Sequence, residues 1–132
     1  MSGVAAIRYM LVNNAPLIAN VPAARILSGV LPITTTIPAI SIRQISGVEM
    51  PMIKRTGTQL VTERVQVSVH ASSYLSQKTI IELIRSAVTS TRGTVNSVSV
   101  DSVDHDGDGP DLYYDEPDIF EQSIDFIVRF YR

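Results

Sequence analysis

The side chains with the clearest chemical spacing lie in an aspartate-rich run of twelve residues, from Asp104 to Asp115. Carboxylates stand at positions 1, 3, 5 and 12 of this run and glycine at position 6, nearly the spacing by which a calcium loop surrounds one ion. Two departures weaken the match. Asp115 replaces the longer glutamate that chelates with both oxygens, and Pro110 constrains the residue whose carbonyl must bind the ion. The candidate calcium ligands are Asp104, Asp106, Asp108 and Asp115.

Repeated aspartate and glycine also suit an exposed turn that holds no ion. The residues before and after the run do not favour an EF-hand, because a Val/Ser strand enters it and Pro117 interrupts the exit. We therefore expect residues 104–118 to form a solvated acidic loop without a metal. A small calcium-dependent binding module that uses Asp104 to Asp115 is kept as an alternative.

Little else in the sequence could perform catalysis. The chain contains no cysteine, and its two histidines are His70, on the polar side of a predicted strand, and His105, in the acidic run. Neither a Gly-x-Ser-x-Gly elbow nor a glycine-rich phosphate loop occurs. The few cations are scattered, which does not favour direct recognition of nucleic acid. We expect neither an enzyme nor a bound cofactor.

The connection formed by residues 47–59 is the stronger candidate for a contact surface. It is long for a hairpin loop, and it places methionine and isoleucine beside a dibasic pair. Such a segment offers adaptable apolar contact together with charge, unless its apolar side chains fold back onto the core. The predicted partner-binding residues are Met50, Met52, Ile53, Lys54 and Arg55.

Alternating strands must position these two segments. Residues 60–71 and 120–131 alternate apolar and polar side chains, the pattern of a sheet with one packed and one solvated face. Gln122 is the one polar residue on the apolar side of the second strand. Residues 39–46 and 95–103 predict two further strands.

Two helices are predicted to cover the apolar face of this sheet. The first spans residues 3–13 after an N-cap at Ser2, and the second begins after a cap at Ser76. Four prolines between residues 15 and 38 predict a loop that holds only a short strand near residues 25–27. The order α-β-β-β-α-β-β indicates a two-layer α+β fold with a largely antiparallel sheet, and residues 1–132 are expected to form one domain.

Charge is distributed unevenly along the chain, although the net charge is only -2. Residues 1–100 carry nine Lys/Arg and three Asp/Glu, whereas residues 101–132 carry two Lys/Arg and ten Asp/Glu. Such segregation is neutralised either inside one fold or between neighbouring copies in head-to-tail contact. A simply solvated acidic loop is the other reading. We find no secretory leader and no apolar run long enough to span a membrane, so we expect no membrane partner.

The order of these short patterns resembles the tail completion or tail terminator proteins of long-tailed bacteriophages. The likeness covers most of the chain and is carried by patterns of the fold rather than by a catalytic signature. Its elements are AISIRQISG at residues 39–47, RVQVSV at 64–69, a helix that opens near Tyr74, YDEP at 114–117 and SIDFIV at 123–128.

The resemblance implies a structural virion protein that assembles in the host cytoplasm. It would form a hexameric ring on the tail tube, stop tube growth and join the tail to the neck or head-completion protein. Another neck connector, a stopper or adaptor, is the alternative within this class. DNA would pass through the ring lumen without specific binding, and carboxylates lining that lumen would keep it from sticking. The carboxylates that we expect to face the lumen are Asp104, Asp106, Asp108 and Asp111.

Overall fold

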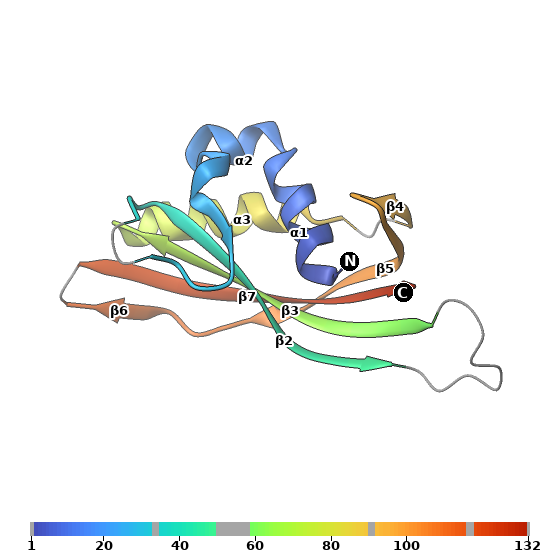
Figure 1. Cartoon of the computed structure of the whole chain (residues 1–132). Coiled ribbons are helices and arrows are strands. Elements are labelled where there is room, and N and C mark those ends of the chain that lie inside the picture. The colour runs from blue at the N-terminus through green and yellow to red at the C-terminus, as the bar shows by residue number, and fades with distance from the viewer. Residues whose placement is uncertain (1, 33–34, 50–58, 90–91, 116–117, 132) are drawn as a thin grey trace.

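The computed structural model describes residues 2–32, 35–49, 59–89, 92–115 and 118–131, and it confirms the predicted α+β class (Figure 1). Helices lie on one face of a mostly antiparallel sheet, which gives two layers. In chain order the elements are α1 (Gly3–Val12), α2 (Ala15–Asn20), a 3-10 turn η1 (Ala23–Arg25), β1 (Ile26–Ser28), β2 (Ala39–Glu49), β3 (Leu60–Ala71), α3 (Tyr74–Ala87), β4 (Gly93–Val95), β5 (Val98–Asp108), β6 (Leu112–Tyr114) and β7 (Ile119–Tyr131).

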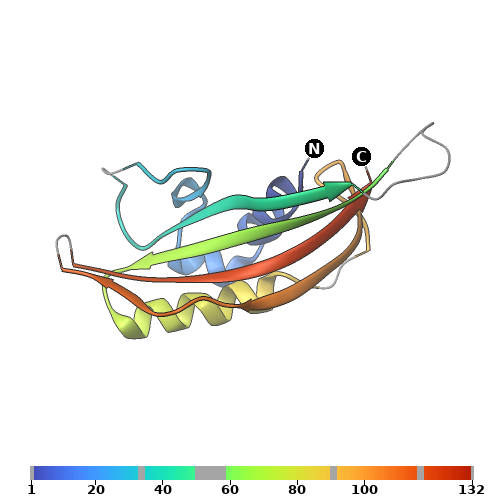
Figure 2. The same ribbon diagram turned by 90° about the horizontal axis from the view of Figure 1, so that it is seen from below.

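The 13-residue strand β7 lies in the middle of the sheet. β3 pairs with one side of it, from Leu60 opposite Tyr131 to Ala71 opposite Phe120. β5 and β6 share the other side of β7, and the sheet order is β1-β2-β3-β7-β5-β4. β1 runs parallel to β2, while the other described pairs are antiparallel. Figure 2 shows that the second face of the sheet carries no helix.

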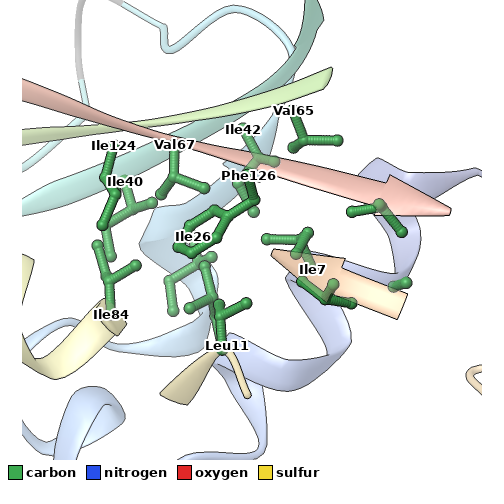
Figure 3. Packing of buried hydrophobic residues seen from close by; sticks show 14 of the residues in the cluster. Ile7, Leu11, Ile26, Ile40, Ile42, Val65, Val67, Ile84, Ile124 and Phe126 are labelled. Carbon is green, nitrogen blue, oxygen red and sulfur yellow. The ribbon is translucent and has the colours of Figure 1, made fainter. Parts of the chain in front are cut away.

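The alternation of β3 and β7 creates the core, as the sequence predicts. Val65 and Val67 of β3 and Phe126 of β7 point toward the helices and are almost completely buried. Ile7 of α1 and Ile84 of α3 meet them from the helical layer (Figure 3). Burying a side chain of this size contributes about 1.5–3 kcal/mol. The packed face of the sheet is therefore buried beneath the helices.

Local capping explains where the two longer helices begin. The Ser2 hydroxyl accepts a hydrogen bond from the backbone N–H of Ala5 at 3.1 Å, which confirms the predicted cap of α1. The prediction of Ser76 as the cap of α3 is wrong. Ser73 is the cap, and its hydroxyl accepts a hydrogen bond from the backbone N–H of Ser76 at 3.1 Å.

The loop predicted for residues 15–38 contains a helix that the sequence reading missed. The side chain of Asn14 accepts a hydrogen bond from the backbone N–H of Leu17 and so caps α2, and Pro16 lies in the first turn. Proline is tolerated there because the first N–H groups of a helix have no intrahelical partner. The short strand expected near residues 25–27 is present as β1, one residue later.

The second half of the chain holds more strand than predicted. The strand expected over residues 95–103 is a hairpin of β4 and β5, because Asn96 and Ser97 adopt positive φ angles of 47° and 65° and turn the chain. β5 then continues to Asp108, and β6 occupies residues 112–114. The prediction of one acidic loop over residues 104–118 is therefore wrong.

β2 is also longer than predicted, because it continues through Gly47 to Glu49. It carries a bulge at Ile45, where its register with β3 shifts. The connection to β3 is correspondingly shorter than the predicted 47–59. In the described part of the chain, no helix is both long enough and apolar enough to cross a membrane.

Candidate interaction surfaces

The aspartates at the start of the acidic run are paired with arginines on the helix-free face of the sheet. Asp104 of β5 accepts a hydrogen bond from Arg129 of β7 at 2.7 Å. Arg64 of β3 forms an ion pair with Asp106 and reaches Asp125 of β7 at 3.3 Å. Two cross-strand groups therefore join β3, β5 and β7: Arg129 with Asp104, and Arg64 with Asp106 and Asp125.

Asp108 lies on the other face of the sheet because β5 contains a bulge between His105 and Gly107. Its carboxylate accepts a hydrogen bond from Arg85 of α3 at 3.0 Å, and the His105 ring lies 3.1 Å away. Burial tends to raise the pKa of Asp108, but the hydrogen bonds from Arg85 and His105 outweigh it and lower the pKa below its usual value. The bulge therefore separates Asp108 from the carboxylates that precede it.

These positions do not build a calcium loop. An ion needs the chain to wrap around it, whereas residues 104–108 are extended and their three carboxylates bind three different cations. Asp115 lies in an exposed turn beyond β6. Among the described residues, no group of three or more His, Asp or Glu side chains is placed to hold a metal.

Asp111 belongs to a network with the first turns of α3. Its carboxylate accepts hydrogen bonds from Lys78 at 2.7 Å, from the Tyr74 hydroxyl at 3.1 Å and from Gln77 at 3.3 Å. The hydrogen bond from Lys78 is the main reason why the pKa of Asp111 is lowered, and it raises the pKa of Lys78 in return. Asp108 and Asp111 thus contact the helical layer, whereas Asp104 and Asp106 lie on the open face. The lumen-facing position of the four carboxylates stays a prediction.

The open face of the sheet carries polar pairs that join neighbouring strands. Ser68 of β3 and Ser123 of β7 share a hydrogen bond at 2.9 Å, and Arg43 of β2 donates to Gln66 of β3 at 2.7 Å. In each pair, the polar side chains of neighbouring strands satisfy each other's hydrogen-bonding groups. The expectation of one apolar and one polar sheet face agrees with this arrangement.

A cleft of about 340 Å³ opens on this face where β1 turns toward β2. Gly29, Val30 and Leu31 form one wall, and strand residues form the floor. The side chains of the floor are those of Ser41, Arg43, Ser68, His70 and Glu121. Burial lowers the pKa of His70, and the negative charge of Glu121 partly opposes that shift.

The floor contains the residue types of a hydrolase but not the required geometry. Ser41 lies 3.4 Å from Nε2 of His70, a long contact for a nucleophile and its base. Ser41 also lies within β2 at a position where β1 pairs on one side and β3 on the other. The backbone amides around it therefore serve the sheet ladders instead of an oxyanion. The cleft therefore lacks a backbone oxyanion hole beside Ser41.

The sequence reading missed a second exposed feature at the β6 end of the sheet. Leu112, Tyr113 and Tyr114 of β6 are 42%, 53% and 47% exposed, and Tyr74 and Leu75 at the start of α3 are 50% and 76% exposed. The Tyr113 ring packs on the Phe120 ring with a centroid distance of 4.8 Å, and this contact holds it in place. The sequence contains a signal for this strand, the run Leu-Tyr-Tyr at residues 112–114, but the run falls within the acidic loop predicted for residues 104–118.

Carboxylates surround this aromatic group. Hydrogen bonding to Asp118, and to a smaller extent to Asp115, raises the pKa of Tyr113, and a hydrogen bond to Glu121 raises that of Tyr114. In the structure as described, Asp115, Asp118 and Glu121 form no ion pair with a cation. The acidic charges of β5 are neutralised within the fold, whereas those at the β6 end contact tyrosine hydroxyls and have no ion-pair partner among the described residues.

The predicted partner-binding residues, from Met50 to Arg55, lie outside the described residues. The structure fixes the strands on each side of them. Glu49 ends β2 and Leu60 begins β3, and both lie at the end of the sheet opposite β6 (Figures 1 and 2).

Comparison with solved structures finds the same fold in a virus-like particle. The chain is similar to one chain of a structure entitled "Virion of native gene transfer agent (GTA) particle", with a TM-score of 0.72 and 14% sequence identity. The alignment covers 99% of this chain and 96% of that chain. No family model and no curated protein sequence matches.

Proposed function

We propose that this chain is a structural virion protein that forms a ring at the end of a bacteriophage tail tube. It stops tube growth and joins the tail to the neck or head-completion protein. The observation that carries the proposal is the likeness of the whole chain to a chain of a gene transfer agent virion. The sequence resemblance to tail terminators assigns the role within such a particle.

The described residues support assembly rather than chemistry. The carboxylates of β5 pair with cations of three other elements, and the cleft lacks the geometry of a hydrolase. An enzyme or calcium module would need reactive or ion-binding groups that face one point. The chain instead offers an uncovered polar face and an exposed aromatic end.

The proposed assembly is a hexamer in the virion, built in the host cytoplasm, through whose lumen DNA passes without specific binding. Met50, Met52, Ile53, Lys54 and Arg55 are proposed to contact a neighbouring subunit, and the ring faces meet the tail tube protein and the neck protein. A stopper or adaptor would also form a ring, but it would not bind the end of a tube.

Electron microscopy of negatively stained protein, alone and mixed with assembled tail tubes, tests this proposal. We expect a six-fold annulus and tubes that carry one such annulus at an end. Mass measurement of the mixture should show that added tube protein no longer lengthens capped tubes. An annulus that leaves tubes uncapped would instead identify another connector, and a monomer beside uncapped tubes would refute the ring.

A further inference from the structure

The exposed aromatic group at the β6 end has the composition of a protein interface. Ten large apolar side chains are exposed in the described part of the chain; Leu112, Tyr113 and Tyr114 are three of them, and Tyr74 and Leu75 are two more. Tyrosines held by packing and hydrogen bonds bind partners with little loss of conformational entropy. The group includes both sides of the sheet end, because Tyr113 pairs with Phe120 on the packed side and Leu112 with Glu121 on the open side. We call the set Leu112, Tyr113, Tyr114, Asp115, Asp118 and Glu121 the β6 surface.

The chemistry of its partner follows from what surrounds the aromatic residues. Asp115, Asp118 and Glu121 lack ion pairs among the described residues, so a partner with cations beside apolar side chains would complement them. The segment between β2 and β3 has that composition, because it reads Met-Pro-Met-Ile-Lys-Arg from Met50 to Arg55.

The two complementary parts cannot meet within one chain. The β6 surface lies at the start of β7, where Tyr114 pairs with Ile119, whereas Leu60 pairs with Tyr131, the last residue of β7. At about 3.3 Å per residue, a strand of this length separates them by about 40 Å. Ten residues separate Glu49 from Leu60, and the chain must leave the sheet and return to it within them. The farthest point of this connection therefore lies no more than roughly 17 Å from the strand ends.

We infer that residues 50–55 of one subunit dock on the β6 surface of a second copy of this chain. The contact joins two different ends of the molecule, so it is heterologous and can repeat from one copy to the next. A ring forms when the rotation between successive copies adds up to a full turn. This inference rests on the proposed ring and names the contact that would build it.

Disulfide trapping tests the contact directly, because the chain contains no native cysteine. A Lys54→Cys chain mixed with an Asp118→Cys chain should yield a cross-linked heterodimer under mild oxidation. The matched control replaces Asp118→Cys with Glu82→Cys, an exposed residue of α3, and should not cross-link with Lys54→Cys. Cross-linking of Lys54→Cys chiefly with itself would reveal a two-fold contact and overturn the inference.

Charge exchange provides a second test. We expect Asp115→Lys with Asp118→Lys, or Lys54→Glu with Arg55→Glu, to weaken self-association at least about tenfold by like-charge repulsion. Combining the two pairs should restore assembly, as measured by analytical ultracentrifugation. Circular dichroism checks that each variant folds. The control variant Glu82→Lys with Asp101→Lys makes the same change in charge as Asp115→Lys with Asp118→Lys, but away from the β6 surface.

The possible outcomes separate this inference from the proposed function. Rings that form and cap tubes, although neither trapping nor charge exchange affects them, would refute the contact and leave the terminator role intact. Wild-type protein that stays monomeric at every concentration, and leaves tubes uncapped, would refute both. Assembly lost in each pair of charge reversals and recovered in the combined variant would support the contact.

Discussion

Glu63 accepts a hydrogen bond from the backbone N–H of Val4 at 3.2 Å, although 59 residues separate them in the chain. Glu63 lies on the packed face of β3, opposite Val128, and is only 2% exposed. Its carboxylate thus meets the first turn of α1, where unpaired N–H groups and the helix dipole favour a negative charge. A Cβ atom on Gly3 would lie 2.9 Å from the same carboxylate oxygen, so glycine permits this close approach.

Glu63→Ala is therefore expected to destabilise the fold. The substitution removes a hydrogen bond to a charged group, and leaves a void beneath α1, so we expect the free energy of unfolding to fall by about 2 kcal/mol. Urea unfolding followed by circular dichroism measures this change. Glu82→Ala is the matched control, because Glu82 is exposed on α3 and its loss should alter stability by less than about 0.5 kcal/mol. Equal effects of the two variants would contradict the role of Glu63.

Gln122 explains why a polar residue interrupts the apolar side of β7. Its side chain is 6% exposed, donates to the carbonyl of Gly109 at 3.1 Å and accepts from Lys78 at 2.8 Å. It thus ties the turn after β5 to α3. The buried Gln77 side chain also donates to Gln122, at 3.5 Å.

Gln122→Leu should lower the free energy of unfolding, although leucine and glutamine have similar volumes. Leucine leaves the Gly109 carbonyl without this donor and Lys78 without one acceptor, and we expect a loss of about 2 kcal/mol in the free energy of unfolding. Chemical denaturation gives the value. Gln66→Leu on the open face is the control, with an expected change below about 0.5 kcal/mol. A Gln122→Leu variant as stable as wild type would show that these hydrogen bonds contribute little.

Patterns that depend on near neighbours could be predicted from the sequence. The alternation of β3 and β7, and the cap of α1 at Ser2, involve residues within a few positions of each other, and the structure has them as expected. The missed helix α2 shows how one signal has two meanings. The prolines between residues 15 and 38 predict a loop, whereas Pro16 lies in the first turn of a helix that Asn14 caps.

The features that could not be predicted depend on contacts distant in sequence. Aspartate is uncommon in strands, so residues 104–108 read as a loop. β5 nevertheless extends through them because β7 pairs beside it and Arg64, Arg85 and Arg129 neutralise its carboxylates. No pattern among neighbouring residues in the sequence predicts those arginine partners. The carboxylates of the β6 surface, which have no ion pair among the described residues, can be distinguished only once these pairs are known.

The pairing of the β5 carboxylates also predicts the response to calcium. Each ligand would have to leave its arginine, and the strand would have to fold into a loop, before an ion could bind. Calorimetric titration with calcium chloride should therefore give no saturable heat, and Asp104→Ala should behave in the same way. Saturable heat in the wild type that disappears in Asp104→Ala would restore the calcium-binding alternative.

His70 predicts that stability falls on mild acidification. Burial in the cleft lowers the pKa of His70 from the ordinary value of 6.5, and Glu121 opposes the shift without reversing it. The unfolded chain therefore binds this proton at a higher pH than the folded chain does. The contribution of His70 to stability is complete above about pH 6.5 and decreases as the pH falls through the window between that value and the lower folded pKa.

Thermal unfolding at several pH values isolates this effect. The melting temperature of the wild type should decrease between about pH 7 and pH 5, and His70→Gln should remove part of that decrease because glutamine does not titrate. Asp108 and Asp111, whose pKa values are lowered by Arg85 and Lys78, lose their contribution only below about pH 4, so their effect is separate. Parallel pH profiles for wild type and His70→Gln would mean that His70 gains its proton equally easily in both states, and that the cleft does not exclude water from its ring.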